Sequence, residues 1–544
     1  MMLSRLAFLH IRHNGRIRRC LQQMVVFFAA IALLGSCAMV GPDYVKPTLQ
    51  EPGDWLEKGD PKIRTEDIDY SQWWTVFNDP VLNRLMESAY NENLNLQIAG
   101  LRVLQARAQL AIAIGDQYPQ QQLGSFEYAY TQTSKNAPGT AFADTSYNSL
   151  SIGFDAAWEL DIWGKFRRNV QSSVGNLEVS VASYDDFLVT LTAEVARIYV
   201  LIRTSEERLG IARENEKIQR RSLEIAVARF KGGAVTELDV TQAKSLLTNT
   251  QSTIPRFEQD IRQLKNALAT LLAKLPGEID AAMEGPGVIP KVPEDVAVGI
   301  PAELLRRRPD IRLAERGLAG QSALIGVAKA DLYPHLQLFG TLGFYTTDAD
   351  NTSAGGGIGG LFDGDSFSFL GGTGIRWDIL NYGRIKNRVR VQDARFEELL
   401  VSYENTVLEA AQEAEDGIVA FLRTQEQEKF LLESVKASKR SVDLSMLQYR
   451  EGLIDYQRVL DTQRFLTDQQ DIQTTVSGDV SLSLVAIYKA LGGGWQYRIG
   501  KDFVAGKYKD QMQQRTNWGK LLEPEKLEVP PSETATESWM WPDW

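Results

Sequence analysis

Cysteine and histidine are scarce in this chain, which has two cysteines and three histidines among 544 residues. Cys20, His10 and His13 lie in an N-terminal segment that we expect to be removed, so the mature chain would keep Cys37 and His335. One thiol and one imidazole cannot form a multi-ligand zinc site, and one cysteine cannot form a disulfide within a chain. A thiol–imidazole dyad is the one such site that this composition leaves open.

Positive charge is outnumbered as well. The chain has 59 Lys and Arg against 70 Asp and Glu, a formal net charge of −11, which argues against nucleic acid as the main partner. Hydrophobic residues make up 44% and aromatic residues 9%, as in a folded protein rather than a disordered acidic tail. Removal of residues 1–36, with five arginines and no acidic residue, would lower the net charge from −11 to −16.

Apolar runs long enough to cross a membrane are missing. The eleven apolar residues of Met24–Leu34 are too few to span a bilayer, and with the arginines before them they have the form of a secretory signal. Leu34-Gly35-Ser36-Cys37 resembles a bacterial lipobox, which predicts a lipoprotein signal peptide over 1–36 and a diacylglycerol and an N-acyl chain such as palmitate on Cys37. The alternative is an ordinary signal with a chance cysteine. No stretch of 18 apolar residues follows Cys37, so no transmembrane helix is expected.

The mature chain contains an internal repeat. An offset of 219 matches Trp158 to Trp377, Gly164 to Gly383, Gly233 to Gly452, Val240 to Val459, Gln251 to Gln470 and Leu272 to Leu491. Upstream the offset is 215, where Tyr118-Pro119 matches Tyr333-Pro334. The change of offset falls in a region rich in Gly, Ser, Thr and Asp, which is typical of a surface loop of variable length. We therefore expect two copies of one structural unit.

Each copy is predicted to contain a β-hairpin. Apolar and polar side chains alternate in four segments, as in strands with one apolar face: 123–131, 149–161, 335–344 and 366–378. The hairpins would cover about 121–161 and about 335–380. Strands of this kind suit either a soluble sandwich or a membrane barrel.

Aromatic residues gather at one end of these strands and favour the barrel, since they would form an interfacial girdle: Tyr118, Trp158, Trp163, Tyr333, Trp377 and Tyr382. Four strands cannot close a barrel, because the smallest known barrels have about eight. If the strands enter the membrane, the chain must therefore oligomerise. A dimer would supply eight strands and a trimer twelve.

The rest of the chain is predicted to be helical. The segments 164–230 and 383–449 contain no proline and carry apolar residues at spacings of three and four, so each predicts a helix about 100 Å long. Gly233 and Gly452 end these helices in tight turns. Helices over 236–273 and 455–491 then return, and Thr236 with Asp239, and Asp455, can cap them.

Searches for catalytic and cofactor motifs fail. Gly355–Gly360 satisfies a Gly-x-Gly-x-x-Gly pattern, but it lies between two strands with no following helix to hold a phosphate. His335, on the polar face at the start of a strand, is better explained as a solvated or lumen-facing side chain than as a general base. We expect no catalytic residue, no metal site and no cofactor beyond the lipid on Cys37.

The chain resembles the TolC-like outer-membrane factors, specifically the lipidated, OprM-like branch. The resemblance begins at Cys37 with Gly41-Pro42-Asp43-Tyr44 and Pro47, and continues through Trp73-Trp74 and Phe77-Asn78-Asp79-Pro80 to Leu491-Gly492-Gly493. About 450 of the 508 residues after the signal are covered. The segment from about residue 496 to the end is not clearly part of this pattern.

The resemblance implies an α+β membrane protein. Three chains would share one twelve-stranded β-barrel in the outer membrane, continuous with a twelve-helix α-barrel in the periplasm. The implied function is that of a passive duct for drugs or other small molecules in a tripartite efflux system, without enzymatic activity. An inner-membrane pump, of RND type, and a periplasmic adaptor would be its partners. The alternatives are a structural lipoprotein that bridges envelope layers and a barrel-embedded enzyme.

The implied organisation along the chain has six parts. They are the signal peptide (1–36), an N-terminal anchor and equatorial segment (37–80), a first repeat (81–277), a linker (278–300), a second repeat (301–494) and a C-terminal periplasmic extension (495–544).

The same resemblance implies a gate at the periplasmic end. The aperture carboxylate falls on Asp461, the aperture arginine on Arg464, and the residues that lock the closed end on Tyr449 and Asp239. The sequence departs from the TolC branch at Ile454, where that branch has a locking arginine, and at Arg458, where it has a second aperture aspartate. Three Asp461 side chains around a threefold axis would select cations, whereas the plainer interpretation is a surface pair between Asp461 and Arg464.

Adaptor docking is implied at the helical tips, near residues 228–240 and 447–458. The turn residues there are Gly232, Gly233, Glu451 and Gly452.

Overall fold

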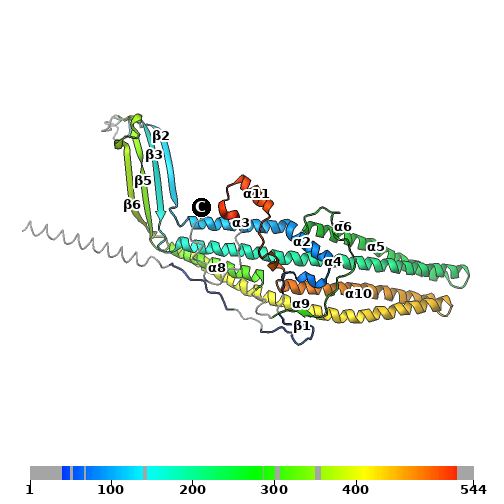
Figure 1. The fold of residues 1–544 in the computed structure, drawn as a ribbon. Coiled ribbons are helices and arrows are strands. Elements are labelled where there is room, and N and C mark those ends of the chain that lie inside the picture. Colours follow the sequence, from blue (N-terminus) through cyan, green and yellow to red (C-terminus); the bar gives the residue numbers. More distant parts are fainter. Residues whose placement is uncertain are drawn as a thin grey trace, which may run out of the picture.

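The computed structural model describes residues 39–48, 53–66, 69–138, 144–285, 287–299, 307–349 and 357–523. The predicted signal peptide, Cys37, part of the predicted linker and the end of the C-terminal extension lie outside these ranges. The described chain is elongated, with a sheet at one end and two helical hairpin tips at the other (Figure 1). None of the helices described combines the length and apolar content that crossing a membrane requires.

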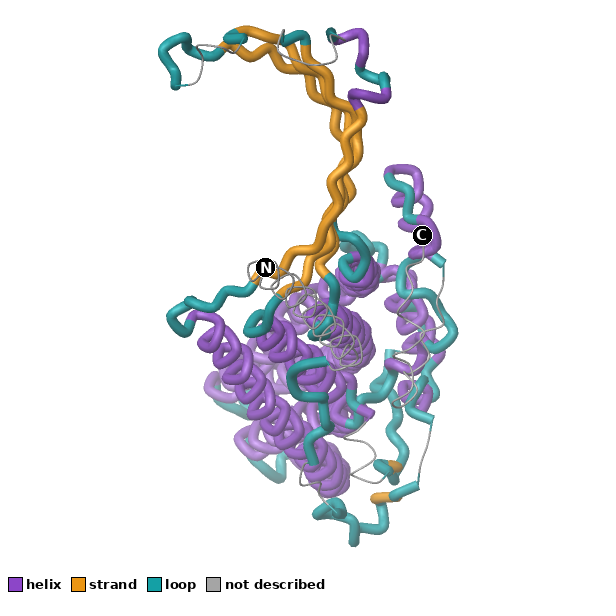
Figure 2. Tube along the Cα trace, turned by 90° about the vertical axis from the view of Figure 1, so that its left-hand side faces the viewer, coloured by secondary structure: helices purple, strands orange, loops and turns teal. Residues whose placement is uncertain are grey.

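The two predicted hairpins are present and join into one sheet. Its strands are β2 (Gln121–Gln132), β3 (Ser146–Glu159), β5 (His335–Thr347) and β6 (Phe367–Arg376), in the order β2-β3-β5-β6. All neighbours are antiparallel, and β3–β5 pairing unites the hairpins. The sheet extends away from the helical body (Figure 2).

The register collects the apolar side chains on one face of the sheet. Phe126 lies opposite Ile152, which lies opposite Phe344, which lies opposite Phe367. The other face has polar pairs, such as Thr341, whose hydroxyl donates to the Asp155 carboxylate at 2.7 Å. Within the described part of the chain, the loop between β5 and β6 covers only the far end of the apolar face, where the Phe362 ring meets the Phe344 ring at 5.5 Å. Phe126 is 70% exposed and Ile375 is 75% exposed.

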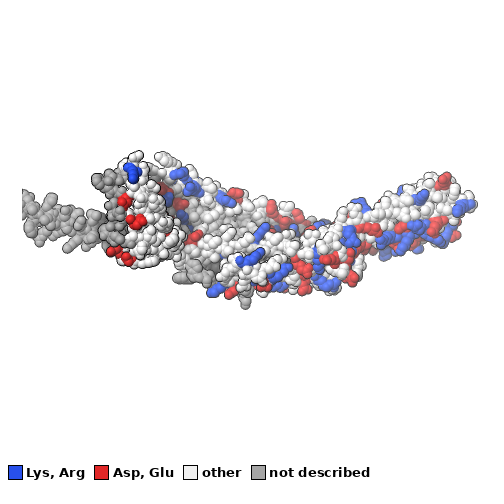
Figure 3. Space-filling view, turned by 90° about the horizontal axis from the view of Figure 1, so that it is seen from above, with Lys and Arg blue, Asp and Glu red and all other residues white. Residues whose placement is uncertain are grey.

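Charged residues follow the helices rather than the sheet. In the face that Figure 3 shows, Lys, Arg, Asp and Glu crowd the helical tips, whereas the sheet is largely uncharged. The strands β2 and β6 are the edges of the sheet, and among the described residues each has a neighbouring strand on one side only. A soluble sandwich would need a second sheet of similar size on this apolar face. The only other sheet described is the two-stranded pair β1 (Ile63–Arg64) and β4 (Val296–Ala297).

The long helices lie within a few residues of their predicted bounds, and they come in pairs of equal length. The 67-residue helices α4 (Lys165–Lys231) and α9 (Arg384–Arg450) begin at an offset of 219, and the 35-residue helices α5 (Glu237–Leu271) and α10 (Tyr456–Ala490) share it. The 22-residue helices α3 (Leu94–Gly115) and α8 (Pro309–Ala330) begin at an offset of 215. These are the two offsets found in the sequence.

Short and long helices line up along the molecule (Figure 1). Both α3 and α5 pack on α4, and both α8 and α10 pack on α9, while α4 contacts α8. The α4–α8 contact is close because glycines face each other. A Cβ added to Gly175 would lie 2.8 Å from the Cα of Gly320. The core at mid-length includes Trp73, which stacks on Tyr488 at a ring distance of 5.3 Å.

The helix ends follow the predicted turns with one exception. Gly233 has φ +70° and Gly452 has φ +80°, so both adopt the left-handed conformation that glycine favours. The Asp455 carboxylate accepts from the Arg458 backbone N–H at 3.3 Å and caps α10. The expected cap by Thr236 is wrong: its side chain makes no cap hydrogen bond, and its backbone carbonyl accepts from the Asp239 N–H instead.

The start of the C-terminal extension folds back onto the helices. A short helix, α11 (Gly506–Arg515), follows a buried contact at Arg498. The Arg498 guanidinium makes two hydrogen bonds to Asp185 on α4, and Arg312 on α8 donates to the same carboxylate at 2.8 Å. Asp185 is 0% exposed, and Arg312 also lies over the Trp495 ring at 4.3 Å. One buried carboxylate therefore joins α4, α8 and the extension.

Replacement of Asp185 by alanine should strongly destabilise the protein, because it leaves two guanidinium groups near one another without their anion. We expect the free energy of unfolding to fall by about 3–5 kcal/mol, measured by denaturant titration in detergent. Asp54→Ala is the matched control, since the exposed Asp54–Lys58 pair should contribute less than about 1 kcal/mol. Equal effects of the two substitutions would contradict this role for Asp185.

Candidate functional site

The candidate site lies at the end of the molecule farthest from the sheet, where the two helical hairpins turn (Figure 1). Gly232 and Gly233 connect α4 to α5, and Glu451 and Gly452 connect α9 to α10. All four turn residues are exposed. Apolar side chains beside them are exposed too, including Leu453, which is 74% exposed, and Leu238.

Tyr449 is the centre of the contact between the two tips. It is 1% exposed, and its ring meets the Tyr456 ring edge-to-face at 5.3 Å. Arg229 on α4 places its guanidinium 4.7 Å from the centre of the Tyr449 ring and donates a hydrogen bond to the Tyr449 backbone carbonyl. An apolar cluster surrounds these residues and comprises Ala226, Ala243, Leu246, Tyr449, Tyr456, Val459 and Leu460.

Asp239 on α5 lies close enough to act on the Tyr449 hydroxyl. The pKa of Tyr449 is raised to about 12, first by burial and then by the negative charge of Asp239, against the opposing charge of Arg229. The hydroxyl therefore stays protonated at physiological pH, and it is buried without a hydrogen-bond partner among the described residues. Burial also raises the pKa of Tyr456, whose hydroxyl lies 3.1 Å from the Ser222 hydroxyl.

The two hairpins are joined above the tips by polar contacts at regular intervals. Residues 208, 215, 222 and 229 of α4 recur every seven positions, as at one seam of a coiled coil. Arg208 makes two hydrogen bonds to Asp471, at 2.7 and 2.9 Å, and Asn215 donates to Gln470 at 3.0 Å. Ser222 with Tyr456 and Arg229 with Tyr449 continue the series. We call these four contacts the polar seam.

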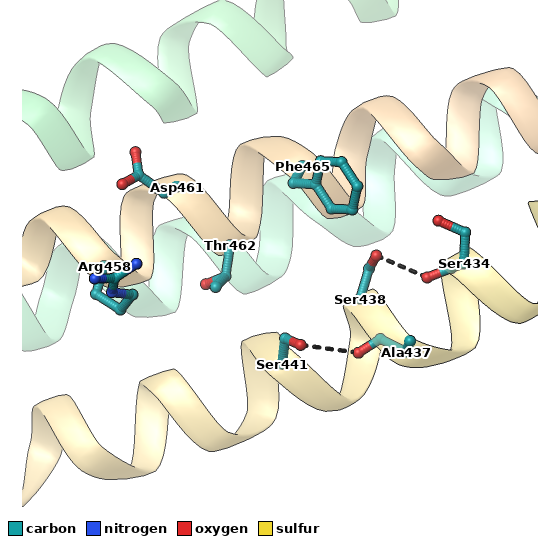
Figure 4. A pocket seen from close by; sticks show the side chains of 8 residues that line it. All are labelled: Ser434, Ala437, Ser438, Ser441, Arg458, Asp461, Thr462 and Phe465. Atoms are coloured by element: carbon teal, nitrogen blue, oxygen red, sulfur yellow. Dashed lines mark hydrogen bonds between the residues drawn. The ribbon is translucent and has the colours of Figure 1, made fainter.

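Asp461 lies outside this seam, in a groove between α9 and α10 (Figure 4). Its carboxylate accepts from the Gln457 side chain at 2.9 Å and points away from the serines of α9. The groove has a volume of about 440 Å³ and is lined by Ser434, Ala437, Ser438, Ser441, Arg458, Asp461, Thr462 and Phe465. Asp461 is exposed and forms no ion pair with any described residue.

Arg464 lies apart from Ile454 and Arg458, the two residues that depart from the family pattern. Arg464 is exposed, and its charge lowers the pKa of Tyr456 against the larger effect of burial. It makes no ion pair with Asp461 in the described chain, so the surface-pair interpretation is not what the structure contains. Ile454 packs against the apolar cluster, and Arg458 lines the groove. The structure thus brings Tyr449 and Asp239 together but leaves Asp461 and Arg464 apart from them.

Sequence reasoning missed Arg229, which supplies a cation to the tip although Ile454 supplies none. Its contact with Tyr449 spans 220 residues, and the only local signal was a basic residue in the last turn of a helix. It also missed the polar seam. A seven-residue spacing of Arg208, Asn215, Ser222 and Arg229 is readable in the sequence, but their partners are not.

The aromatic residues predicted as a girdle lie where the sheet meets the helices. Three indole N–H groups donate to backbone carbonyls there: Trp158 to Gln117, Trp163 to Pro334 and Trp377 to Leu332. His335, at the start of β5, lies 2.7 Å from the Glu159 carboxylate. Across the described residues, no group of three His, Cys, Asp or Glu side chains could hold a metal ion.

Comparison with known proteins gives consistent matches. The family model "Outer membrane efflux protein" matches residues 85–274 and 300–493. Nodulation protein T of Rhizobium leguminosarum bv. trifolii is 30% identical over 466 residues, 85% of this chain and 96% of the relative. The pyoverdine export outer membrane protein OpmQ of Pseudomonas putida is 32% identical over 428 residues, 78% of this chain and 88% of the relative.

Solved structures show the same fold. The outer-membrane channel OprN has a TM-score of 0.78 at 31% identity, covering 84% of this chain and 99% of that one. The CmeC channel of Campylobacter jejuni also has a TM-score of 0.78, at 23% identity, covering 88% of this chain and 99% of that one.

Substitution of Arg229 by methionine should loosen the tips, because it removes both the cation over the Tyr449 ring and the donor to its carbonyl. Together these contacts are worth about 1–3 kcal/mol. Amide hydrogen exchange in residues 449–456 should then accelerate about tenfold or more. Arg221→Met is the control, since exposed Arg221 pairs only with Glu224 on its own helix. Unchanged exchange in the Arg229 variant would show that Arg229 does not hold the tips.

Proposed function

This chain belongs to the outer membrane efflux protein family, and we propose that three copies of it form one channel-tunnel through which small molecules leave the cell passively. It is the outer-membrane component of an efflux system, located in the cell outer membrane and extending into the periplasm. Its fold is that of the TolC-like outer-membrane channels. The trimer, the closed barrel and the absence of chemistry in the duct are parts of the proposal.

The observation that carries the proposal is the uncovered sheet. An edge strand in lipid leaves backbone N–H and C=O groups without partners, which costs several kcal/mol for each group. The strands β2 and β6 are such edges, and the apolar face between them is exposed. Three copies of four strands close a twelve-stranded barrel, whose apolar face meets lipid and whose polar face, with Asp155 and Glu159, meets water.

The helices support a continuous tunnel below that barrel. In each chain α3 and α5 follow one another along α4, and α8 and α10 follow one another along α9. Each chain thus contributes four rods of similar length, two in each of two structural repeats, and three chains contribute twelve. At 1.5 Å per residue, the 67 residues of α4 alone reach about 100 Å into the periplasm.

A lipid anchor on Cys37 fits the position of the residues that follow it. Cys37 itself lies outside the described residues, but the Val40 N–H donates to the Trp163 carbonyl at 3.0 Å. Three residues of extended chain span at most about 11 Å, which is the reach from Val40 back to Cys37. We propose that a diacylglycerol and an N-acyl chain on Cys37 would enter the outer-membrane lipid at the level of the proposed girdle.

The partners we propose are a periplasmic adaptor and, beyond it, an inner-membrane pump of RND type. The adaptor would dock on Gly232, Gly233, Glu451 and Gly452. The exposed apolar side chains of Leu238 and Leu453 offer it a surface that water solvates poorly. Nothing in this proposal involves nucleic acid.

We propose that two features control the closed end. The polar seam holds the hairpins of each chain together, with the charge of Asp239 acting on the buried Tyr449, and opening would exchange the seam contacts for water. Asp461 is free to face the axis, so three copies would form an acidic ring in which Arg464 is the neighbouring cation. Like charges in a narrow aperture repel one another and attract cations.

The channel itself is tested by oligomeric state and conductance. Unheated detergent extracts of outer membranes should give a band at the mass of three chains that collapses to one chain on boiling. The purified oligomer should conduct ions in planar bilayers. A monomer without conductance would contradict the channel and favour the structural lipoprotein.

Asp461→Ala should lower the preference for cations, because it removes three negative charges from the aperture at once. We expect the cation-to-anion permeability ratio to fall about twofold or more in single-channel recordings. Asp443→Ala, which removes an exposed carboxylate of α9 outside the groove, is the control and should leave the ratio unchanged. An unchanged ratio for the Asp461 variant would remove Asp461 from the aperture.

A further inference from the structure

One surface beside the sheet is exposed without an evident purpose in a single chain. Tyr382, just before α9, is 94% exposed and has φ +50°, which is unusual for a tyrosine. Arg384, two residues later, forms no ion pair with any described residue. Below them a groove of about 760 Å³ runs along α9, lined by Arg390, Asp393, Ala394, Glu397, Glu398 and Val401.

The corresponding surface at the start of α4 is covered within the same chain. Trp163 and Lys165 correspond to Tyr382 and Arg384 at the offset of 219 that separates α4 from α9. The Trp163 ring stacks on Tyr333 at 4.6 Å with an interplanar angle of 24°, and the Lys165 ammonium lies 2.9 Å from the Asp331 carboxylate. These contacts fasten the start of α4 to the turn between α8 and β5.

The residues that α4 contacts, in the turn between α8 and β5, also have equivalents in the turn between α3 and β2. Tyr118 and Asp116 correspond to Tyr333 and Asp331 at the offset of 215 that separates α3 from α8. Asp116 is exposed and has no ion pair with a described residue. Tyr118 adjoins β2, whereas Tyr382 adjoins β6, at the opposite edge of the sheet. Three strand spacings of about 4.8 Å separate those edges, so the two residues cannot stack within one chain.

We propose that the start of α9 in one copy docks on the α3–β2 turn of a second copy and repeats there the contact that α4 makes with α8. Tyr382 then stacks on Tyr118 of the second copy, and Arg384 pairs with its Asp116. This inference rests on the proposed trimer and names the residues that join its subunits.

The charges along the helices fit the same arrangement. In the chain Glu178 on α4 lies 3.5 Å from Arg316 on α8. The two offsets carry these positions to Glu397 on α9 and Leu101 on α3. Arg102, the next residue of α3, is exposed and makes no ion pair with any described residue, and neither do Glu397 and Glu398. In the proposed arrangement, Arg102 of a second copy would therefore lie at the same height along the helices as Glu397 and Glu398.

The proposed contact is also compatible with a closed ring of copies. It joins two different surfaces of the same chain, so each copy uses one surface and offers the other to the next copy, and a rotation that closes gives a ring. The same docking sets β6 of one copy beside β2 of the next. The edge strands of the sheet are thereby paired, and the groove on α9 receives α3.

Cross-linking tests the contact directly. In the full chain, Tyr118→Cys combined with Tyr382→Cys should give dimer and trimer bands after treatment of outer membranes with a short bismaleimide, on denaturing gels of boiled samples. Each single-cysteine variant controls for Cys37. Tyr118→Cys with Leu408→Cys is the matched control, since Leu408 is 68% exposed on the same helix but lies far along it from Arg384. It should give no ladder, and an equal ladder from it would overturn the proposal.

A charge exchange provides a second measurement that does not depend on cysteine variants folding. Asp116→Arg and Arg384→Glu alone should each lower the fraction of heat-resistant oligomer by about fivefold, and the double variant should return it to within about twofold of wild type. No rescue would overturn the pairing. An Arg384→Glu variant that assembles normally but loses binding to vesicles of anionic phospholipid would overturn it too. If the wild-type protein is itself monomeric, the proposed trimer is wrong. If the wild-type protein is oligomeric but the variants show neither a cross-linked ladder nor rescue, only this residue pairing is wrong.

Discussion

An antiparallel sheet with two open edges and one uncovered apolar face is the constraint on which the rest of this structure depends. Backbone groups at an edge need partners, most strongly in lipid, where water cannot supply them. The chain has four strands in this sheet, and nothing else among the described residues covers Phe126, Phe369 or Ile375. A single copy therefore leaves strand edges and apolar side chains without partners among its described residues.

The contacts between helices differ between the middle of the helical body and its tips. Near mid-length the contacts are close and mostly buried: glycine faces glycine between α4 and α8, and the buried Asp185 carboxylate pairs with two arginines. Toward the tips the hairpins are joined by separate polar contacts, of which Ser222 with Tyr456 is buried and Arg208 with Asp471 is partly exposed. Water can replace the partners of the exposed pair at little net cost, because hydrogen bonds in the folded chain replace hydrogen bonds to water.

Much of the fold could be predicted because its signals are local. Alternation of side chains located all four strands of the large sheet, and Gly233 and Gly452 marked the ends of helices of 67 residues. The cap predicted at Thr236 was wrong because a serine or threonine side chain competes with backbone groups for the same donors, and here the Thr236 carbonyl took the N–H of Asp239. At the candidate site, the proximity of Tyr449 and Asp239 could be expected from the family pattern, whereas Arg229 was invisible because its partner is 220 residues away.

The sequence by itself determined the elements and their two offsets, and its strand number predicts more than one copy if the strands enter the membrane, since periodicity, glycine turns and strand number are properties of consecutive residues. Only the tertiary structure decided which of the scattered polar residues meet. Arg498 reaches Asp185 across 313 positions, and Asp471 reaches Arg208 across 263. Such pairs depend on how the helices pack side by side, and helix packing is set by the summed shape of many side chains rather than by any local pattern.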